Sequence, residues 1–378
     1  MRSHIVKLDM TSFERTTGKI LIMKHSLILA SLPIAMIAVT SIAEPLGLVL
    51  SGGGAKGAYE VGVWSSLYEA GLTKDVVAIS GTSIGAVNAA LFASWPDPKG
   101  AERLWLENLG KVFVPNDRIL QMASERKFAE FLDGKLQTYA EIAGIPAASL
   151  PEDSRRAIER EARDEFARKG ILRDLATALK TYQDSLVGEA RDGLCDGNVL
   201  RTVLEDNLPT NWPRTMPRVY VTALMNNEWR PQAFCLNKGT SDDRILRLLA
   251  STAIPAVFPP VKIDGKSYID GGYEARGGDN TPLKPILDHH SDIKTVIVVY
   301  LNDEKNLGTF RRAKNRAAAS AAGVRLVEII PSENIDGAFG ISGVFDTSPK
   351  TARRLIELGR RDARKALAAA GMVRSAGR

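Results

Sequence analysis

Ser83 is the residue of this chain with the clearest potential for covalent chemistry. It lies at the centre of the segment Gly81–Gly85, two residues from a glycine on either side. The apolar run Val76–Ile79 precedes this segment, and residues 86–92 are typical of a helix. A serine between two glycines at a strand-to-helix turn indicates a nucleophile elbow, which exposes the hydroxyl at the end of the strand. The helix N-terminus beneath it would supply N–H groups and partial positive charge for an anion.

A glycine-rich loop, Ser51–Gly57, is the second segment suited to chemistry. It follows the apolar run Leu46–Leu50 and precedes a pattern typical of a helix at 58–70. Backbone N–H groups without side chains beside them can approach a developing oxyanion closely. The candidate oxyanion donors are Gly52, Gly53 and Gly54. Lys56 adds positive charge nearby, and the helix beginning near Gly57 points its positive end at the same place.

The same loop also fits the spacing of a dinucleotide-binding fingerprint, because Gly52, Gly54 and Gly57 have the required separation. The Rossmann version needs an acidic residue at the end of the second strand, where this chain has Ser80 and then the elbow. A P-loop needs lysine directly after its last glycine, where this chain has Ala58. These departures favour an oxyanion loop over a nucleotide site.

The serine needs a base, and the chain has four histidines. His4 and His25 lie in the leader, so a Ser-His-Asp triad would use His289 or His290. Both follow Asp288 in a polar segment, which a solvated turn also explains. An esterase with a histidine triad therefore stands as an alternative.

Asp270 is the better candidate base. It ends a predicted hairpin strand and precedes Gly271 and Gly272. Although a carboxyl with the ordinary pKa of about 3.9 is a weak base, burial would raise the pKa. It could then take the proton of the serine and return it to the leaving alcohol. An isolated Asp-Gly-Gly is more often a simple turn, so this assignment depends on the elbow and the glycine loop.

The elements around these motifs predict an α/β fold. Strand, helix, strand and helix follow one another at the start of the chain, which indicates a mainly parallel sheet covered on both faces. Later segments typical of strands or hairpins are 218–224, 232–236, 261–269, 295–301 and 324–330, and later helices are expected at 242–250 and 349–370.

Residues 101–190 have a different texture, with charged helical segments and no strand signals. We interpret them as a helical insertion after the nucleophile helix. Its apolar stripe can pack on the main domain, and a lid or lipid-facing cap is the alternative. The stripe consists of Ile171, Leu175, Leu179, Tyr182 and Leu186.

The charge balance argues against nucleic-acid binding. The formal charge of the 378 residues is +6. Residues 1–43, with five basic and two acidic side chains, account for half of it. The remainder is close to neutral and has no basic stretch interleaved with aromatic residues.

The leader predicts export. Lys24 and His25 precede an apolar stretch, 27–42, and Ser41–Ala43 offers small residues for signal-peptidase cleavage near Ala43. Met23 would be a natural start of this signal. A periplasmic or secreted protein is expected, with an uncleaved membrane anchor as the alternative.

The two cysteines, Cys195 and Cys235, form no C-x-x-C pair, and no His/Cys cluster suggests a metal site. They could pair in an oxidising compartment, or be two small buried residues.

Several separated segments resemble the patatin-like phospholipases. Ser51–Gly57 resembles the oxyanion loop of this family, Gly81–Gly85 its nucleophile elbow, and Asp270–Gly272 its catalytic aspartate motif. Ala250–Pro260 is similar to the stretch before that aspartate, and Leu355–Gly359 to the closing helix. Each motif alone is weak, but together and in this order they are highly specific.

The resemblance implies a three-layer α/β/α fold and a Ser-Asp dyad without histidine, metal or cofactor. It implies hydrolysis of fatty-acyl esters of phospholipids, lysophospholipids or neutral lipids through an acyl-serine, with transient contact with a membrane surface. A catalytically silent lipid-binding protein of the same fold is the alternative. The domain is expected over 44–372, followed by a short tail, 373–378. The expected supporting residues are Lys56, Gly57, Gly81, Gly85, Gly271 and Gly272.

Overall fold

The computed structural model describes residues 44–109, 112, 117–169, 195–255, 257–305, 309–335 and 346–373. The chain divides into a unit at 1–42 and a unit at 43–378, and only the second contains described residues. The predicted export signal and the stripe from Ile171 to Leu186 lie outside the described residues. Within the described ranges, no helix combines the length and the apolar character needed to span a bilayer.

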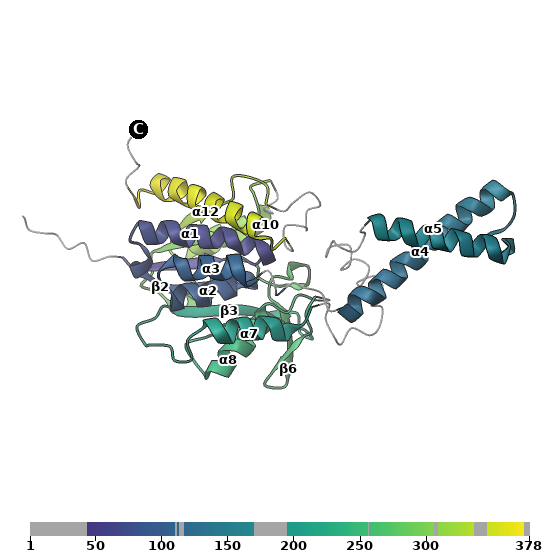
Figure 1. The fold of residues 1–378 in the computed structure, drawn as a ribbon. Coiled ribbons are helices and arrows are strands. Elements are labelled where there is room, and N and C mark those ends of the chain that lie inside the picture. The colour runs from purple at the N-terminus through teal and green to yellow at the C-terminus, as the bar shows by residue number, and fades with distance from the viewer. Residues whose placement is uncertain are drawn as a thin grey trace, which may run out of the picture. The chain divides into compact units, whose positions relative to one another are not determined.

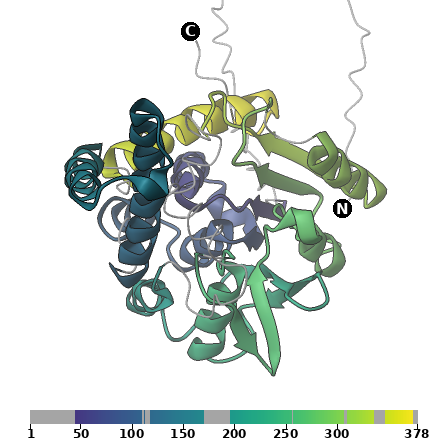
Figure 2. The same cartoon turned by 90° about the vertical axis from the view of Figure 1, so that its right-hand side faces the viewer.

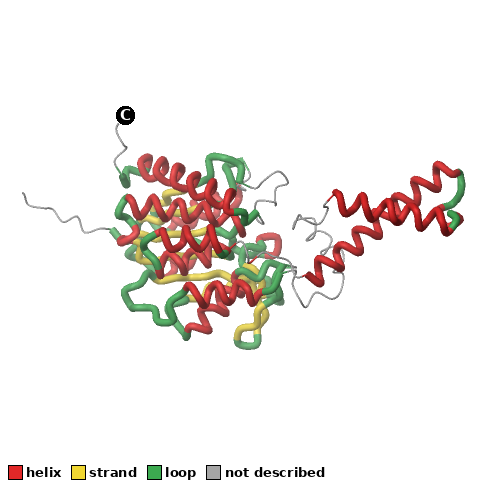
Figure 3. The backbone as a smooth tube through the Cα atoms, viewed as in Figure 1, coloured by secondary structure: helices red, strands yellow, loops and turns green. Residues whose placement is uncertain are grey.

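Eight strands form one mixed, mostly parallel sheet (Figures 1 and 3). The strands are β1 (Leu46–Leu50), β2 (Val76–Thr82), β3 (Arg218–Met225), β4 (Arg230–Cys235), β5 (Val261–Ile263), β6 (Lys266–Asp270), β7 (Thr295–Val299) and β8 (Arg325–Ile329). Their order is β5-β6-β3-β2-β1-β7-β8, and β4 pairs with β3. The five strands β3, β2, β1, β7 and β8 run parallel, whereas β4, β5 and β6 pair antiparallel.

Helices cover both faces of this sheet. The helices in the described part of the chain are α1 (Ala58–Glu69), α2 (Ile84–Ser94), α3 (Pro98–Glu107), α4 (Asp117–Ala143), α5 (Glu152–Lys169), α7 (Gly197–Asn207), α8 (Ser241–Ser251), α9 (Lys284–His289), α10 (Thr309–Ala321) and α12 (Pro349–Ala369), of which α4 and α5 pack against each other and not on the sheet. Figure 2 shows α10 and α12 on opposite sides of β8. The predicted three-layer α/β/α fold is confirmed.

The strand sequences explain the two helical layers. In β1, Leu48 and Leu50 join the core formed with α1, α2, α3 and α12, whereas Val49 joins the core formed with α9 and α10. Successive side chains of a strand point to opposite faces, so a strand buried on both sides is apolar at nearly every position. The continuous apolar runs of β1 and β7 follow from this double burial.

Most elements predicted in the main domain are present, including the antiparallel pairing of β4 with β3 and the β5–β6 hairpin. Asp264 and Gly265 form the hairpin turn, each with positive φ. Three helices, α7, α9 and α10, were not predicted. Both Cys195 and Cys235 are free thiols.

The helical insertion begins later than the sequence suggested. Leu104 and Trp105 of α3 are buried in the main core, and α3 packs against α1 and α12. Helix α3 is amphipathic, and its charged outer face led to its assignment to the insertion although its apolar face packs in the main core. After it, α4 and α5 pack against each other around Ala140 and Ile158.

Helices α1 and α12 meet with their backbones almost in contact (Figure 1). A Cβ added to Gly62 of α1 would lie 1.9 Å from the carbonyl oxygen of Ile356. A Cβ added to Gly359 of α12 would lie 2.0 Å from the carbonyl oxygen of Tyr59. Because each obstacle is backbone, relief requires the two helices to separate.

We therefore expect Gly359→Ala to lower the free energy of unfolding by about 3 kcal/mol, measured as a fall in the thermal midpoint. Gly134→Ala in α4 is the matched control, because no atom lies within 4 Å of the added methyl group. Alanine is the better helix former, so the control should be neutral or stabilising. Equal midpoints for the two variants would contradict the close-contact explanation.

Candidate active site

Ser83 occupies a backbone conformation that other residues rarely adopt. It directly follows β2 and caps α2, with φ 55° and ψ −125°. The turn is tight enough that a Cβ at Gly81 would lie 2.2 Å from the Gly85 carbonyl oxygen. A Cβ at Gly85 would lie 2.5 Å from the carbonyl oxygen of Leu50. Both glycines are therefore required sterically, as expected for a nucleophile elbow.

Ser251 supports this strained turn from outside the motif. Its hydroxyl accepts a hydrogen bond from the Ser83 N–H at 2.9 Å and donates to the carbonyl oxygen of Thr222 at 2.7 Å. Its own carbonyl accepts from the Gly271 N–H at 3.4 Å. One residue at the end of α8 thus links the elbow, β3 and the segment after Asp270.

The strand register brings Asp270 beside the elbow. Thr82, directly before Ser83, pairs with Thr222 of β3, and Asp270 pairs with the next residue, Ala223. Strand β4 pairs with one edge of β3. Strands β2 and β6 therefore share the opposite edge, where β2 pairs as far as Thr222 and β6 pairs from Ala223 onward. A Cβ at Gly271 would lie 2.1 Å from the Thr222 carbonyl oxygen, which shows how closely the strand end approaches.

Asp270 is a buried carboxyl with a strongly raised pKa. It is 6% exposed, and Ser83 is 5% exposed. Its Oδ1 accepts from the Gly272 N–H at 2.7 Å, while its Oδ2 is buried without a hydrogen-bond partner among the described residues. Burial raises the pKa to about 6, although the Ser83 hydroxyl and the Gly272 N–H act in the opposite direction. The carboxyl therefore has an unused acceptor and the proton affinity of a base that works near neutral pH.

The glycine loop is held by Asn280, and this changes which amides are available. The Gly52 N–H donates to the Asn280 carbonyl oxygen at 3.0 Å, and the Asn280 side-chain amide donates to the Gly52 carbonyl at 3.1 Å. Gly52 still lies against the elbow, since a Cβ there would meet the Ser83 Cβ at 3.1 Å. Within the described residues, no backbone carbonyl accepts from the N–H of Gly53 or Gly54. We therefore narrow the candidate donors to Gly53 and Gly54.

The remaining predicted residues surround this loop. Lys56 is 4% exposed, and its stem packs against Gly53. At Gly57 the loop touches Ile84 of α2, and a Cβ there would lie 2.6 Å from the Ile84 side chain. Gly272 faces Asn280. The predicted supporting residues thus lie around the elbow.

His289 and His290 lie elsewhere. The His290 Nε2 is 3.1 Å from the Tyr220 hydroxyl, and the His289 ring stacks on Tyr220. Tyr220 pairs with Ser80, three residues before the nucleophile along β2. Burial also lowers the pKa of His290. The structure does not bring either histidine to Ser83, so it favours the aspartate as the base.

A narrow cavity borders Ser83 and Gly54. Its other walls are almost entirely apolar: Ile84, Val87, Leu109, Val112, Leu200, Thr252, Ile254 and Phe258. Such a lining suits a hydrocarbon chain attached to a carbonyl group at Ser83.

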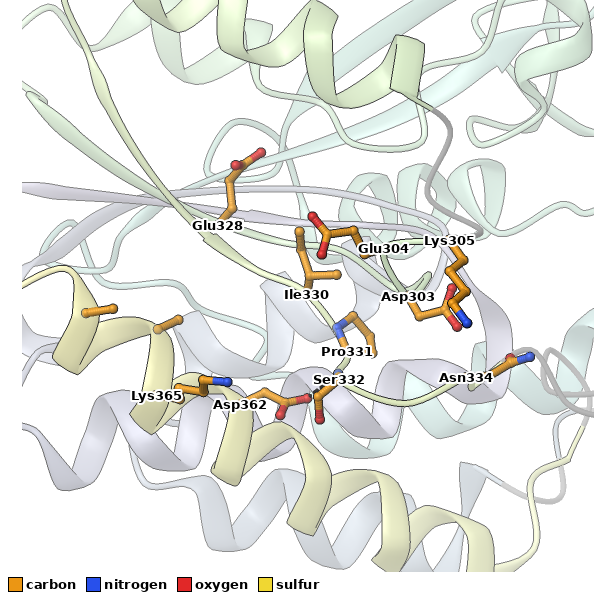
Figure 4. A pocket seen from close by; sticks show the side chains of 12 residues that line it. Asp303, Glu304, Lys305, Glu328, Ile330, Pro331, Ser332, Asn334, Asp362 and Lys365 are labelled. Atoms are coloured by element: carbon orange, nitrogen blue, oxygen red, sulfur yellow. Dashed lines mark hydrogen bonds between the residues drawn. The ribbon is translucent and has the colours of Figure 1, made fainter.

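A wider hollow of about 770 Å³ lies between α12 and the ends of β7 and β8 (Figure 4). Carboxyl groups of Asp303, Glu304 and Asp362 line it together with Lys305 and Lys365. It shares no lining residue with the cavity at Ser83. No group of three His, Cys, Asp or Glu residues suited to a metal ion occurs in the described parts of the chain.

Sequence reasoning missed the roles of Ser251 and Asn280. Ser251 has a fully buried hydroxyl at the end of α8. The signal available in the sequence was its place at the end of an amphipathic helix. Asn280 follows a run of glycines and acidic residues and precedes Thr281 and Pro282, which reads as an ordinary turn. Only the fold shows that they hold the elbow and the glycine loop.

Comparison with known families agrees with the motifs. The family model described as "Patatin-like phospholipase" matches residues 48–286. Lysophospholipase nte1 of Aspergillus terreus (strain NIH 2624 / FGSC A1156) is 58% identical over 48 residues, which are 13% of this chain and 3% of that protein. Patatin-like phospholipase domain-containing protein ZK370.4 of Caenorhabditis elegans is 52% identical over 52 residues, 14% and 4% of the two chains. The matches therefore span only a small part of these curated relatives.

Two solved structures are among the similar folds. VipD from Legionella pneumophila has a TM-score of 0.41 and 17% identity, over 86% of this chain and 67% of that chain. Human GIVD cytosolic phospholipase A2 has a TM-score of 0.43 and 11% identity, over 87% and 59% of the two chains.

Removing the Ser251 hydroxyl should weaken the elbow. We expect Ser251→Ala to slow the reaction of Ser83 with a fluorophosphonate probe roughly ten- to a hundredfold, because the buried Ser83 N–H loses its acceptor. The control is Ser94→Ala, since Ser94 bonds the Ala90 carbonyl of its own helix. Labelling of Ser251→Ala at the control rate would show that this hydrogen bond does not position Ser83.

Burial of Asp270 should also lower the stability of the fold. Its folded-state pKa of about 6 is above the unfolded value, so stability is lost as pH rises towards 6. We expect Asp270→Asn to raise the free energy of unfolding by about 3 kcal/mol near pH 8 and little near pH 4, measured by denaturant unfolding. The exposed Asp264→Asn is the control. A gain for Asp270→Asn that is independent of pH would contradict this explanation.

Proposed function

The chain belongs to the patatin-like phospholipase family, and on this premise we propose that it is a serine lipid acyl hydrolase with a Ser83–Asp270 dyad. The observation that carries the proposal is the adjacency of the two residues along one edge of β3, with the free Oδ2 of Asp270 buried beside the elbow. This arrangement supplies a nucleophile and a base without histidine.

In the acylation step, the Ser83 Oγ attacks the ester carbonyl of the substrate. As the bond to carbon forms, the hydroxyl proton passes to the Asp270 carboxylate, for which Oδ2 is the available acceptor. The raised pKa makes this transfer easier than it would be for an exposed aspartate. The tetrahedral intermediate then expels the alcohol, which takes the proton back from Asp270, and the acyl group stays on Ser83.

The oxyanion of that intermediate needs fixed donors. The N–H groups of Gly53 and Gly54 are the candidates, because the Gly52 N–H is already bonded to Asn280. Loss of one such donor typically raises the barrier by about 3 kcal/mol. In deacylation a water molecule repeats the sequence: Asp270 takes its proton, the hydroxide oxygen bonds to the acyl carbon, and the Ser83 Oγ leaves and recovers the proton.

The family and the cavity both support the proposed substrate class. An apolar lining beside Ser83 favours a fatty-acyl ester over a small polar ester. The names of the two curated relatives refer to a lysophospholipase and a patatin-like phospholipase domain. We propose phospholipids, lysophospholipids or neutral lipids as substrates, met by transient contact with a lipid surface. Export of the protein, with cleavage near Ala43, stays a prediction.

The test is lipid hydrolysis by purified protein. We expect Ser83→Ala and Asp270→Asn each to reduce fatty-acid release at least about a thousandfold, because nucleophile and base act as one unit. The matched control is Ser80→Ala, which removes a buried hydroxyl of β2 that has no hydrogen-bond partner among the residues the structure describes. Full turnover by either dyad variant, with the fold intact by circular dichroism, would refute the assigned roles.

A further inference from the structure

The cavity at Ser83 is too small for a fatty-acyl chain as it stands. Its free space is about 20 Å³, which is roughly what one water molecule needs. A chain attached to a carbonyl at Ser83 must therefore displace part of the lining. Which side chains move determines where the chain goes and how long it can be.

Three residues separate this cavity from an outer groove. Leu200 of α7, Thr252 after α8 and Phe258 line both spaces. They are only 4%, 7% and 6% exposed, so they form a closed wall rather than a surface. The groove beyond them has about 190 Å³ of free space.

The groove can accept hydrocarbon along its base and water at its rim. Leu249, Pro259 and Val261 supply apolar surface next to the wall. Asp196, Asn198 and Arg201 of the α7 region supply polar groups. A chain that enters from the wall would therefore rest on apolar side chains.

We propose that Leu200, Thr252 and Phe258 form a gate that sets the length of the acyl chain, an inference that rests on the proposed function. The groove then receives the distal part of long chains. Short chains need to displace only the lining on the Ser83 side of the wall. Longer chains must displace it, and their last methylene groups then lie against Leu249 and Val261.

Phe258 is the main obstacle in this gate. Thr252 is held in place because its hydroxyl donates to the Leu248 carbonyl at 3.0 Å. Phe258 has the largest side chain of the three and lies in the irregular segment between α8 and β5. Shortening it opens more passage than any other single change in the wall. It is a specificity-determining residue rather than a catalytic one.

The experiment measures kcat/KM for p-nitrophenyl butyrate, octanoate and palmitate with the full chain. We expect Phe258→Ala to raise the palmitate-to-octanoate ratio about tenfold, and Phe258→Trp to lower it by a similar factor. Leu200→Ala should act in the same direction as Phe258→Ala. The matched control is Phe234→Ala on β4, a partly buried phenylalanine that lines neither space.

A second variant tests the groove itself. Adding Val261→Trp to Phe258→Ala fills the groove without restoring the wall, so the gain for palmitate should disappear while octanoate hydrolysis stays the same. A gain that survives Val261→Trp would place the chain elsewhere and overturn the groove assignment. If Phe258→Ala and Leu200→Ala both have the same palmitate-to-octanoate ratio of kcat/KM as the control Phe234→Ala, the gate is wrong.

Failure of the gate and failure of the proposed function give different results. If the gate is wrong, the unmodified protein still hydrolyses the esters and loses that activity with Ser83→Ala. If the function is wrong, no ester is hydrolysed in a Ser83-dependent way at any chain length.

Discussion

One edge of β3 places Ser83 and Asp270 next to each other. Backbone hydrogen bonds of β2 end there at Thr222, and those of β6 begin at the next residue, Ala223. Because a ladder permits only one register when both faces are buried, the last residue of each incoming strand has no alternative position. The ends of the two strands therefore lie side by side although 187 positions separate Ser83 from Asp270, the proposed nucleophile and base, in the chain. Strand pairing brings these residues together. The tight turn at Ser83, the hydrogen bonds of Ser251 and those of Asn280 then fix their positions more closely.

In the proposed dyad, burial of Asp270 raises the proton affinity of its carboxyl and at the same time lowers the stability of the fold. An aspartate in water would hold its proton too weakly to remove one from a serine hydroxyl. Burial raises the pKa of Asp270 to about 6, and its Oδ2 has no hydrogen-bond partner in the described part of the chain. The ionised state of this carboxyl is therefore unfavourable in the folded protein, and the ladders around it must offset that penalty.

Local motifs made much of this site predictable from the sequence, and long-range packing made the rest unpredictable. The steric limit at Gly81 acts within five residues, because its obstacle is the Gly85 carbonyl oxygen, so it can be read directly, whereas the obstacle at Gly85 is the distant Leu50 carbonyl oxygen. Asp270 could be chosen over the histidines, but its contact with the elbow depends on strand order. Asn280 binds Gly52, and α3 packs in the main core, through contacts with residues that are distant in the chain. A pattern within a short stretch of sequence cannot indicate contacts with such distant residues.

The glycine contact between α1 and α12 has a consequence for how the protein is made. Helix α1 begins directly after the oxyanion loop, and its outer face rests on a helix that ends at Ala369. Helix α12 follows every other described element of the chain, so the growing polypeptide holds the serine, the loop and the aspartate before α1 has this partner. Packing of α1 is thereby coupled to translation through α12, and a product truncated before α12 lacks the helix that supports α1 after the glycine loop.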